Sequence, residues 1–456
     1  MPFSCIDSKV FYHCLPVKVK NNFVKFKKFG RGDDLLLLFL FKGTKYMDLC
    51  VLLLLTAEAL LGLFLLYREG LLRSRWAWAF SILLLAGAFA LRGAALDYQT
   101  LDYQNFLTRW VDFFRDNGGF RALAYPVGNY NIPYLYFLAL FSYSGIKDLY
   151  LIKLLTILFD VLLAWACLRL AGRFTESKPR KLACFFTVLY LPTVFLNGAV
   201  WGQCDAIYVA LAVLSIALAL EDRPAASMIC IALSFGFKLQ AVFVMPVFAV
   251  LWMYGKFNWK HFLIFPLAYL ILVLPAVLLG RPFLDTLTLY ASQTGSIGDG
   301  LNYNSPSIFA VFTQITDPKR ASAVAIGAAA VYTLNVLAVA FANRRKLTDQ
   351  AVLGAALLFA VGIPFLLPHM HDRYFFAADI LTLVLAFSLP LYFLTALVAQ
   401  FASLLGYHAY LKMRYLLPMR YGSAALILVL ALALTVFLTG LRKAPRPKRK
   451  RSAYKS

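Results

Sequence analysis

Long apolar segments are the feature that most limits what this chain can fold into. A helix needs about 20 mostly apolar residues to cross the roughly 30 Å of hydrocarbon in a bilayer, and we identify about 12–13 such segments. The expected spans are 48–67, 76–93, 150–170, 182–200, 204–220, 225–240, 241–254, 261–279, 321–342, 351–367, 374–389, 391–407 and 421–441. Only helices and closed barrels can span lipid, and these segments are too long for barrel strands. The sequence therefore predicts an all-α, polytopic integral membrane protein.

The composition agrees with lipid as the solvent for this chain. Of its 456 residues, 61% are hydrophobic and only 15% are charged, whereas a soluble domain carries about 25% charged residues. The net charge of +23 is concentrated toward the two ends of the chain, which suits a negatively charged membrane surface better than nucleic acid. The seven cysteines show no CxxC or metal-ligand spacing, so no disulfide framework is predicted.

Lysine and arginine in short loops predict the orientation, because such loops favour the cytoplasmic side. The basic segments expected in the cytoplasm are 68–75, 171–181, 255–260, 343–349 and the tail 442–456. The alternate loops then lie outside, including two long ones at 94–149 and 280–320. The first long loop contains amphipathic pieces at 103–117 and 133–143 rather than a clean span. Loops of this length are usually functional, so we expect a site that faces outward at the cell membrane.

The first 46 residues do not fit this scheme. They are basic but would lie outside, and they lack the small-residue cleavage site of a signal peptide. Met47 begins a typical membrane-protein start, MDLCVLLLL. We interpret 1–46 as a non-native or disordered extension and 47–441 as the membrane domain. The alternative is a disordered cytoplasmic arm, with one helix fewer in the count.

Polar residues that a membrane protein keeps only at a cost form several clusters, and the predicted topology puts every cluster on the outer face. The candidate site residues are Asp97, Asp102, Tyr103, Trp110, Asn131, Trp201, Gln203, Asp205, Lys238, Gln240, Asn304, His371, Asp372 and Arg373. Chance would scatter such residues over both faces. Their convergence therefore predicts a functional site.

Each cluster also has a structural explanation that needs no activity. Asp97 or Asp102 could cap the helix that follows, and Trp201 could be an interfacial aromatic residue. Lys238 could extend along its helix to the membrane surface. The segment 369–373 could be a solvated turn, or its two histidines could bind a metal. These explanations are independent of one another, so all of them would have to hold at once. Together they account poorly for the finding that every polar cluster is predicted on the same face.

A carboxylate beside cations in a watery crevice suits transfer of a group from a lipid phosphate. Asp102 would act as the general base that takes the proton from the acceptor hydroxyl. Lys238, His371 and Arg373 would stabilise the leaving phosphate, and the other candidates would contact sugar or acceptor, with Tyr and Trp rings stacking on sugars. The sequence has no Gly-rich phosphate loop and no nucleotide-binding βαβ pattern. We therefore expect the donor to arrive through the lipid.

Motifs between residues 76 and 390 carry a family resemblance. They are DYQNFLTRWVDFF (102–114), GNYNIPYLY (128–136), IKLLTILFD (152–160), WGQCDAIY (201–208), ALSFGFKLQAVFVMP (232–246) and PHMHDRYFFAADI (368–380). This ordered set resembles GT-C fold glycosyltransferases, especially the bacterial proteins related to the second mannosyltransferase of GPI-anchor synthesis. A weaker likeness is to the dolichyl-phosphate-glucose glucosyltransferases.

The resemblance implies a polyprenyl-phosphate sugar donor, inverting transfer and a catalytic acid in the first outer loop. Carried over to this chain, the acid is Asp102, with Asp97 in the near-duplicate LDYQT as the alternative. The chain has no DxD motif, so metal dependence is not implied and no cofactor is expected. The expected function is transfer of a hexose, mannose or glucose, to an extracytoplasmic glycan, lipid or protein acceptor.

Two other classes of protein could use the same polar groups. A transporter or flippase of a lipid-linked sugar would place them near the bilayer midplane on broken helices, often in two related repeats. No internal repeat is visible, and the polar set lies at one surface. The second rival is a non-catalytic membrane partner in the assembly of envelope glycans.

Overall fold

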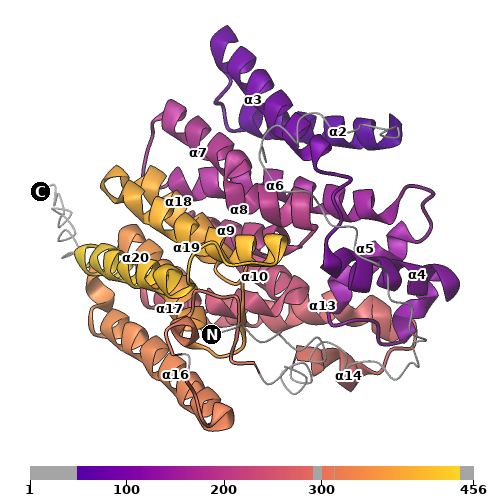
Figure 1. Ribbon diagram of the computed structural model, residues 1–456. Helices are drawn as coiled ribbons and strands as arrows, with labels where there is room; N and C mark the ends of the chain where they lie inside the picture. The colour runs from indigo at the N-terminus through magenta and orange to yellow at the C-terminus, as the bar shows by residue number, and fades with distance from the viewer. Residues whose placement is uncertain (1–48, 291–299, 313, 442–456) are drawn as a thin grey trace, which may run out of the picture.

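The chain forms a bundle of helices in the computed structural model, which describes residues 49–290, 300–312 and 314–441 (Figure 1). Eight of the described helices are long and apolar enough to cross a membrane. They are α2 (Leu49–Arg68), α3 (Arg75–Ala94), α6 (Asp148–Ala171), α12 with α13 (Trp259–Leu278), α16 (Pro318–Ala342), α17 (Asp349–Leu366), η8 with α19 (Pro390–Lys412) and α20 (Arg420–Thr439). The predicted all-α polytopic architecture is confirmed, but among the described residues eight helices, or nine with one bent pair, are long enough to span, where about 12–13 were expected. The predicted N-terminal extension and basic tail lie outside the described residues.

A further crossing is built from two helices that meet at a bend of 45°. Helix α7 (Lys178–Tyr190) ends before Leu191, whose backbone is extended because the next residue is Pro192. Helix α8 (Pro192–Phe195) then runs into the π-helix η4 (Leu196–Trp201). The described part of the chain also contains shorter apolar helices, namely α5 (Ile132–Phe141), α9 (Asp205–Leu220), α10 (Pro224–Phe237) and α18 (Phe376–Ser388).

The expected span at 241–254 is not a continuous helix. It is divided between the 3-10 helix η5 (Leu239–Phe243) and α11 (Val247–Met253), with Pro246 between them, a residue that lacks an N–H for the helix ladder. Seven residues of α-helix rise only about 10 Å, which is well short of the bilayer. This segment therefore packs within the bundle without crossing it alone.

The first long loop forms a small helical unit of its own. It contains the π-helix η2 (Tyr103–Leu107), α4 (Thr108–Asp116), the 3-10 helix η3 (Gly119–Ala124) and α5. Gly118 and Gly119 both have positive φ, 84° and 63°, which allows the sharp turn after α4. The amphipathic helix α4 buries Val111 and Phe114, which join a hydrophobic cluster with residues of α5 and α6. This unit carries Asp102 at its beginning.

The second long loop is tied to the turn between α17 and α18 by a two-stranded parallel sheet. Strand β1 (Asn302–Tyr303) pairs with β2 (Met370–His371), with Tyr303 opposite His371. The other short elements are α14 (Phe283–Leu287), η6 (Ile308–Ala310) and η7 (Arg344–Lys346). The pairing of β1 with β2 thus holds side by side two segments that lie about 70 residues apart in sequence.

The basic loops meet at one end of the bundle, which we call the basic end. Arg173 pairs with Asp349 across 3.1 Å, and the Tyr254 hydroxyl donates to Asp349 across 3.0 Å. The Thr348 hydroxyl donates to the carbonyl of Gly440 across 2.8 Å. Three of the loops predicted to be cytoplasmic, namely 171–181, 255–260 and 343–349, therefore lie at one end with the end of α20. The opposite end, which we call the site end, collects the turns after α3, η4 and α10, between α17 and α18, and after α19. That the site end faces outward stays a prediction.

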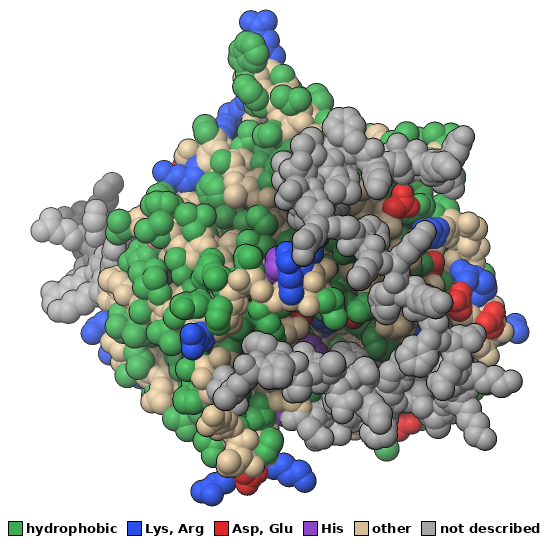
Figure 2. All heavy atoms as spheres, in the orientation of Figure 1, with side chains coloured by type: hydrophobic (Ala, Val, Ile, Leu, Met, Phe, Trp, Pro, Cys, Tyr) green, Lys and Arg blue, Asp and Glu red, His purple; other side chains and the backbone are tan. Residues whose placement is uncertain are grey.

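Central and peripheral helices differ in burial. Within the most apolar window of each helix, 83% of α17 is buried, but only 22% of α2 and 22% of α16. Figure 2 shows hydrophobic side chains over most of the described surface on one face, with Lys and Arg in a few places. A surface this apolar needs lipid to cover it, so the structure supports a multi-pass membrane protein.

Candidate active site

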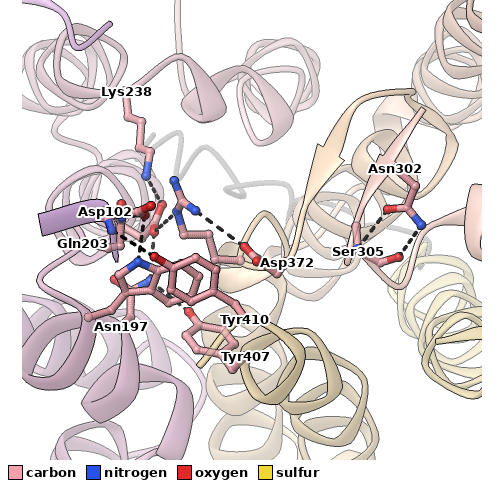
Figure 3. A network of polar contacts seen from close by, with 12 residues as sticks. Asp102, Asn197, Gln203, Lys238, Asn302, Ser305, Asp372, Tyr407 and Tyr410 are labelled. Atoms are coloured by element: carbon pink, nitrogen blue, oxygen red, sulfur yellow. Dashed lines mark hydrogen bonds and ion pairs between the residues drawn. The ribbon is translucent and has the colours of Figure 1, made fainter. Parts of the chain in front are cut away.

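Asp102 is the residue on which polar groups at the site end converge (Figure 3). Trp201 Nε1 donates to Asp102 Oδ2 across 2.9 Å, and Gln203 Nε2 donates to the same oxygen across 2.7 Å. The Tyr410 hydroxyl accepts the backbone N–H of Asp102 across 3.2 Å. These bonds join the first long loop, the turn after η4 and the end of α19. They fix the Asp102 side chain at the point where these three segments meet.

The helix-cap explanation for Asp102 is wrong. Asp102 precedes η2, but its backbone is already helical and its side chain makes no capping hydrogen bond. Asp97, the alternative catalytic acid, is exposed and accepts a hydrogen bond from the Tyr150 hydroxyl on α6. Of the two near-duplicate aspartates, only Asp102 receives hydrogen bonds from Trp201 and Gln203 within the described structure.

Trp201 is enclosed by neighbouring side chains. The Tyr410 ring stacks on it with centroids 3.8 Å apart and an interplanar angle of 10°. The Arg373 guanidinium lies over the ring, 5.1 Å from its centroid. With 1% of the residue exposed, Trp201 is not an interfacial aromatic residue. It has no open face for the predicted stacking on a sugar, and its contact with Asp102 makes it a positioning residue.

Asp205 holds the two cations of the site. It is fully buried at the start of α9 and forms ion pairs with Lys238 and with Arg373, the latter across 3.5 Å. Asn197 donates to Asp205 across 2.8 Å and to the Tyr407 hydroxyl across 2.9 Å. Lys238 is itself only 6% exposed, so the proposal that it extends to the membrane surface is wrong. Both cations thus lie in the same buried network as the carboxylates (Figure 3).

Asp372 is a second buried carboxyl in this network. Its Oδ1 lies 3.5 Å from Arg373 Nη1. Burial raises the pKa of Asp372 to about 7; Arg373 opposes this shift, while Asp102 and Asp205 add to it. A Cβ at Gly406 of α19 would lie 2.7 Å from the carbonyl oxygen of Asp372, so α19 packs directly on this turn. The net charge of the site therefore changes by one unit near neutral pH.

His371 lies beside the cations but is not one of them at neutral pH. Its ring stacks on Tyr303, with centroids 4.7 Å apart and an interplanar angle of 13°. Burial lowers the pKa of His371 to about 3, and the charges of Arg373 and Lys238 lower it further in the same direction. In the neutral form it can offer an N–H to a phosphate oxygen, but it adds no positive charge.

Two predicted residues, Tyr103 and Asn131, lie in the core of the first loop rather than in the network. The buried Tyr103 hydroxyl donates to Asp148 across 2.9 Å. Asn131 donates to the Tyr269 hydroxyl across 3.1 Å, and its side chain caps α5. Both residues therefore hold the loop on the bundle, and neither offers an open surface to a sugar.

Trp110, Gln240 and Asn304 lie in the layer around the network. The Trp110 ring meets Tyr130 edge-on at 5.6 Å, and the Tyr130 hydroxyl donates to Gln203 across 3.0 Å. Trp110 is therefore linked to Asp102 through two intervening residues, Tyr130 and Gln203. The side chain of Gln240 bonds Tyr374 in the turn that carries Arg373, and Asn304 accepts a hydrogen bond from Tyr415.

Four residues of the site were not predicted from the sequence: Tyr130, Asn197, Tyr407 and Tyr410. The two tyrosines of α19 are spaced three residues apart and so lie on one face of the helix. Two hydroxyl groups on one face near the end of a span were the signal that could have found them. Tyr130 lies inside the motif GNYNIPYLY quoted above, and Asn197 lies shortly before WGQCDAIY, but neither side chain carries a charge to mark it.

The histidine pair shows no metal-site geometry. His369 Nδ1 lies 2.7 Å from the carbonyl oxygen of Gly300, and Nε2 lies 3.4 Å from the Ser322 hydroxyl. Among the described residues, no group of three or more His, Cys, Asp or Glu is arranged to hold a metal ion. His369 instead fastens the second long loop to the turn after α17.

Comparison with known protein families gives a match to one part of the chain. Residues 138–254 match the family described as alpha-(1->6)-mannopyranosyltransferase, N-terminal domain. No curated protein matches the chain. The matched segment runs from α5 to α11 and includes Trp201, Gln203, Asp205 and Lys238. The match supports a mannosyltransferase family for this chain, and hence a glycosyltransferase with a sugar donor and an acceptor.

Proposed function

We propose that the protein is a GT-C type mannosyltransferase that takes its sugar from a polyprenyl-phosphate donor and transfers it, with inversion, to an extracytoplasmic acceptor. The observation that carries the proposal is the Asp102 carboxylate. Two donors hold it, and Arg373 covers the Trp201 ring that supplies one of them. A fixed base beside cations is what transfer from a phosphate leaving group requires.

The proposed reaction is a single displacement. The acceptor oxygen attacks the anomeric carbon as Asp102 takes the hydroxyl proton, and the bond from that carbon to the phosphate oxygen breaks. The leaving polyprenyl phosphate gains the negative charge, which Lys238 and Arg373 stabilise. Asp205 keeps these two side chains in place between turnovers. The proton leaves from Asp102 to water once the products separate.

The stereochemistry of the donor follows from this reaction. A single displacement inverts the anomeric carbon, whereas two successive displacements would retain its configuration. The matched family is named for α-(1→6) transfer. An inverting enzyme that makes an α linkage must start from a β-linked sugar phosphate, so the proposed donor is a β-mannosyl phosphopolyprenol.

The position of the network favours an enzyme over a transporter. Asp205 begins α9, Lys238 follows α10, and Asp372 and Arg373 lie between α17 and α18. These are helix ends gathered at one end of the bundle, where an acceptor in water can meet a donor in lipid. A transporter would need its binding residues near the middle of the bundle.

Substitution of Asp102 tests the proposal. Asp102→Asn keeps the size of the side chain but cannot take a proton, and a general base contributes about 10²–10⁴ in rate. The full-length protein in nanodiscs, given radiolabelled β-mannosyl phosphopolyprenol and lipid-extract acceptors, should lose at least about a hundredfold of its transfer rate. Asp97→Asn is the matched control and should retain transfer within about threefold, because Asp97 contacts Tyr150 and not the network. Near-normal transfer by the Asp102 variant would overturn the assignment.

A further inference from the structure

One face of helix α6 carries polar residues that the proposed reaction does not use. Lys153, Thr156 and Asp160 are spaced three and four residues apart, so they share a face of the helix. Each is at most 1% exposed. They belong to the motif IKLLTILFD, and charged groups buried in a membrane-spanning helix are costly to keep. We call these three residues the α6 polar face.

Lys153 fixes the segment that leads to Asp102. Its ammonium donates to the carbonyl oxygens of Ala95, Leu96 and Tyr98 across 2.7, 3.1 and 2.6 Å. An ammonium has three N–H donors, so all of them are used on one short stretch of backbone. These carbonyls lie at the end of α3, where a helix leaves carbonyls unpaired and attracts positive charge. Asp102 follows Tyr98 closely along the chain, after a short non-helical stretch.

Asp160 fixes the last turn of α3. Its Oδ2 accepts hydrogen bonds from Arg92 Nε and Nη2 across 3.1 and 2.9 Å, and both side chains are fully buried. The α6 polar face therefore binds the chain segment before Asp102 at two successive places. The first is Arg92, and the second is the set of backbone carbonyls that follows it.

The same face also contacts the segment that supplies the two donors to Asp102. Gly198 of η4 lies so close that a Cβ there would be 3.0 Å from Thr156 Cγ2 and 3.2 and 3.3 Å from the Asp160 carboxylate oxygens. Helix η4 leads directly to Trp201, and the turn after it carries Gln203. The α6 polar face thus contacts both segments that form the site. One segment leads from α3 to Asp102, and the other leads from η4 to Trp201 and Gln203.

We infer that the α6 polar face sets the position of Asp102 relative to Trp201 and Gln203, and that Lys153 is the positioning residue with the largest effect on turnover. This inference rests on the proposed function, because it concerns how that reaction is assembled. A misplacement of about 1 Å can cost about a hundredfold in rate. Loss of Lys153 should therefore slow the chemical step and leave donor binding almost unchanged.

Lys153→Met is the direct test, because methionine fills similar space and has no donors. In nanodiscs, kcat for mannosyl transfer, normalised to folded protein, should fall by about ten- to a hundredfold, with donor KM within about twofold of wild type. The decisive variant is Asp102→Asn combined with Lys153→Met. If Lys153 acts through Asp102, the double variant should transfer no more than about twofold more slowly than Asp102→Asn alone, because residues that act as a unit are not additive.

The outcomes separate this inference from the proposed function. Normal transfer by Asp102→Asn would overturn the function, and the inference with it. The other outcome concerns the double variant. If Asp102→Asn alone loses about a hundredfold and the double variant loses in addition the whole factor seen in Lys153→Met, the function stands and the inference is overturned. A purely structural role for Lys153 would act independently of the base and give such a multiplied loss.

If Lys153→Met fails to fold, Gly198→Ala tests the contact between α6 and η4 instead. The added methyl pushes η4 away from α6 by a few tenths of an ångström, and kcat should fall by about three- to tenfold with donor KM unchanged. Gly327→Ala on the peripheral helix α16 is the matched control, because a Cβ there meets nothing within 4 Å. Equal activity of the two alanine variants would overturn the role of the α6 polar face.

Discussion

The ion pairs at the two ends of the bundle differ in how much water reaches them. At the site end, the side chains of Lys238 and Asp205 are 7% and 1% exposed. At the basic end, the side chains of Arg173 and Asp349 are 37% and 21% exposed. The basic end also holds Lys256 with Asp222, whose carboxylate is 76% exposed. Exposed pairs of this kind contribute about 0–1 kcal/mol. Burying both charges is costly, and an apolar pair of the same shape is often as stable.

The difference between the ends teaches what each set of charges is for. Charges at the basic end are numerous, partly solvated and replaceable, as expected for residues that determine orientation. The charges of the network at the site end are buried, and they converge from segments far apart in sequence. Such an arrangement is retained at a cost in stability, which favours a role in binding and chemistry for the network around Asp205.

The sharpest way to test the two ends is to label them from outside the cell. In a variant without the native cysteines, Leu416→Cys at the site end should react with an impermeant thiol reagent in intact cells. Arg345→Cys at the basic end should react only after the membrane is permeabilised, because the basic loops are predicted to be cytoplasmic. Both positions are exposed. The reverse pattern would put the network in the cytoplasm and exclude an extracytoplasmic acceptor.

Breaking one ion pair at each end should give unequal losses. Lys238→Met leaves Asp205 buried without its closest cation, which should cost about 3–5 kcal/mol of stability and abolish measurable transfer. Lys256→Met at the basic end should cost less than about 1 kcal/mol. Thermal unfolding followed by intrinsic fluorescence and the mannosyl-transfer assay measure both variants.

A second variant separates stability from activity at the site end. Lys238→Met combined with Asp205→Asn removes both members of the pair, so much of the stability should return. Transfer should stay lost, since the phosphate then lacks a cation. Recovery of transfer together with stability would mean that Lys238 serves only the fold.

The smallest expected effect is on the pH dependence of donor binding. The pKa of Asp372 is raised to about 7, so this carboxyl becomes negative as pH rises from 6 to 8. Its charge then competes with the donor phosphate for Arg373, and donor KM should rise by about three- to tenfold over this range, on the order of 1 kcal/mol. A phosphodiester donor does not titrate there, and His371, with a pKa of about 3, stays neutral.

Asp372→Asn should remove this dependence. The amide is neutral at every pH, so donor KM should stay near its low-pH value from pH 6 to pH 8. The groups that face Asp372 are Asp102, Asp205 and Arg373, and none of them changes in the variant. An unchanged rise of KM with pH in Asp372→Asn would assign the titration to another group.

Much of the fold followed from the sequence because length and hydropathy determine which segments span lipid. Loop charges also predicted which loops share an end, and the contact of Arg173 with Asp349 agrees with that prediction. The broken segment around Pro246 was missed because a run of apolar residues looks the same whether or not the helix continues through it.

The site was predicted less completely, and the reasons are physical. Asp97 and Asp102 lie in near-identical sequences, and only contacts across the fold distinguish them. Tyr410 is a tyrosine in an apolar helix, which by sequence is indistinguishable from a core residue, yet it covers Trp201 and contacts a residue 308 positions away. Trp201 itself was expected to stack on a sugar, because the burial of a ring cannot be read from the spacing of residues in the sequence.

Two π-helices border the site, and this feature affects how the protein can change over generations. Helix η2 starts directly after Asp102, and η4 ends at Trp201. A π-helical turn accommodates one residue more than an α-helical turn. Loss of a single codon in either segment would remove this extra residue and restore a regular α-helical turn, while the residues on either side keep their register. A lineage could therefore alter the turn beside Asp102 or Trp201 in one step while it keeps an intact membrane protein, and a one-codon insertion at the same place could rebuild that turn.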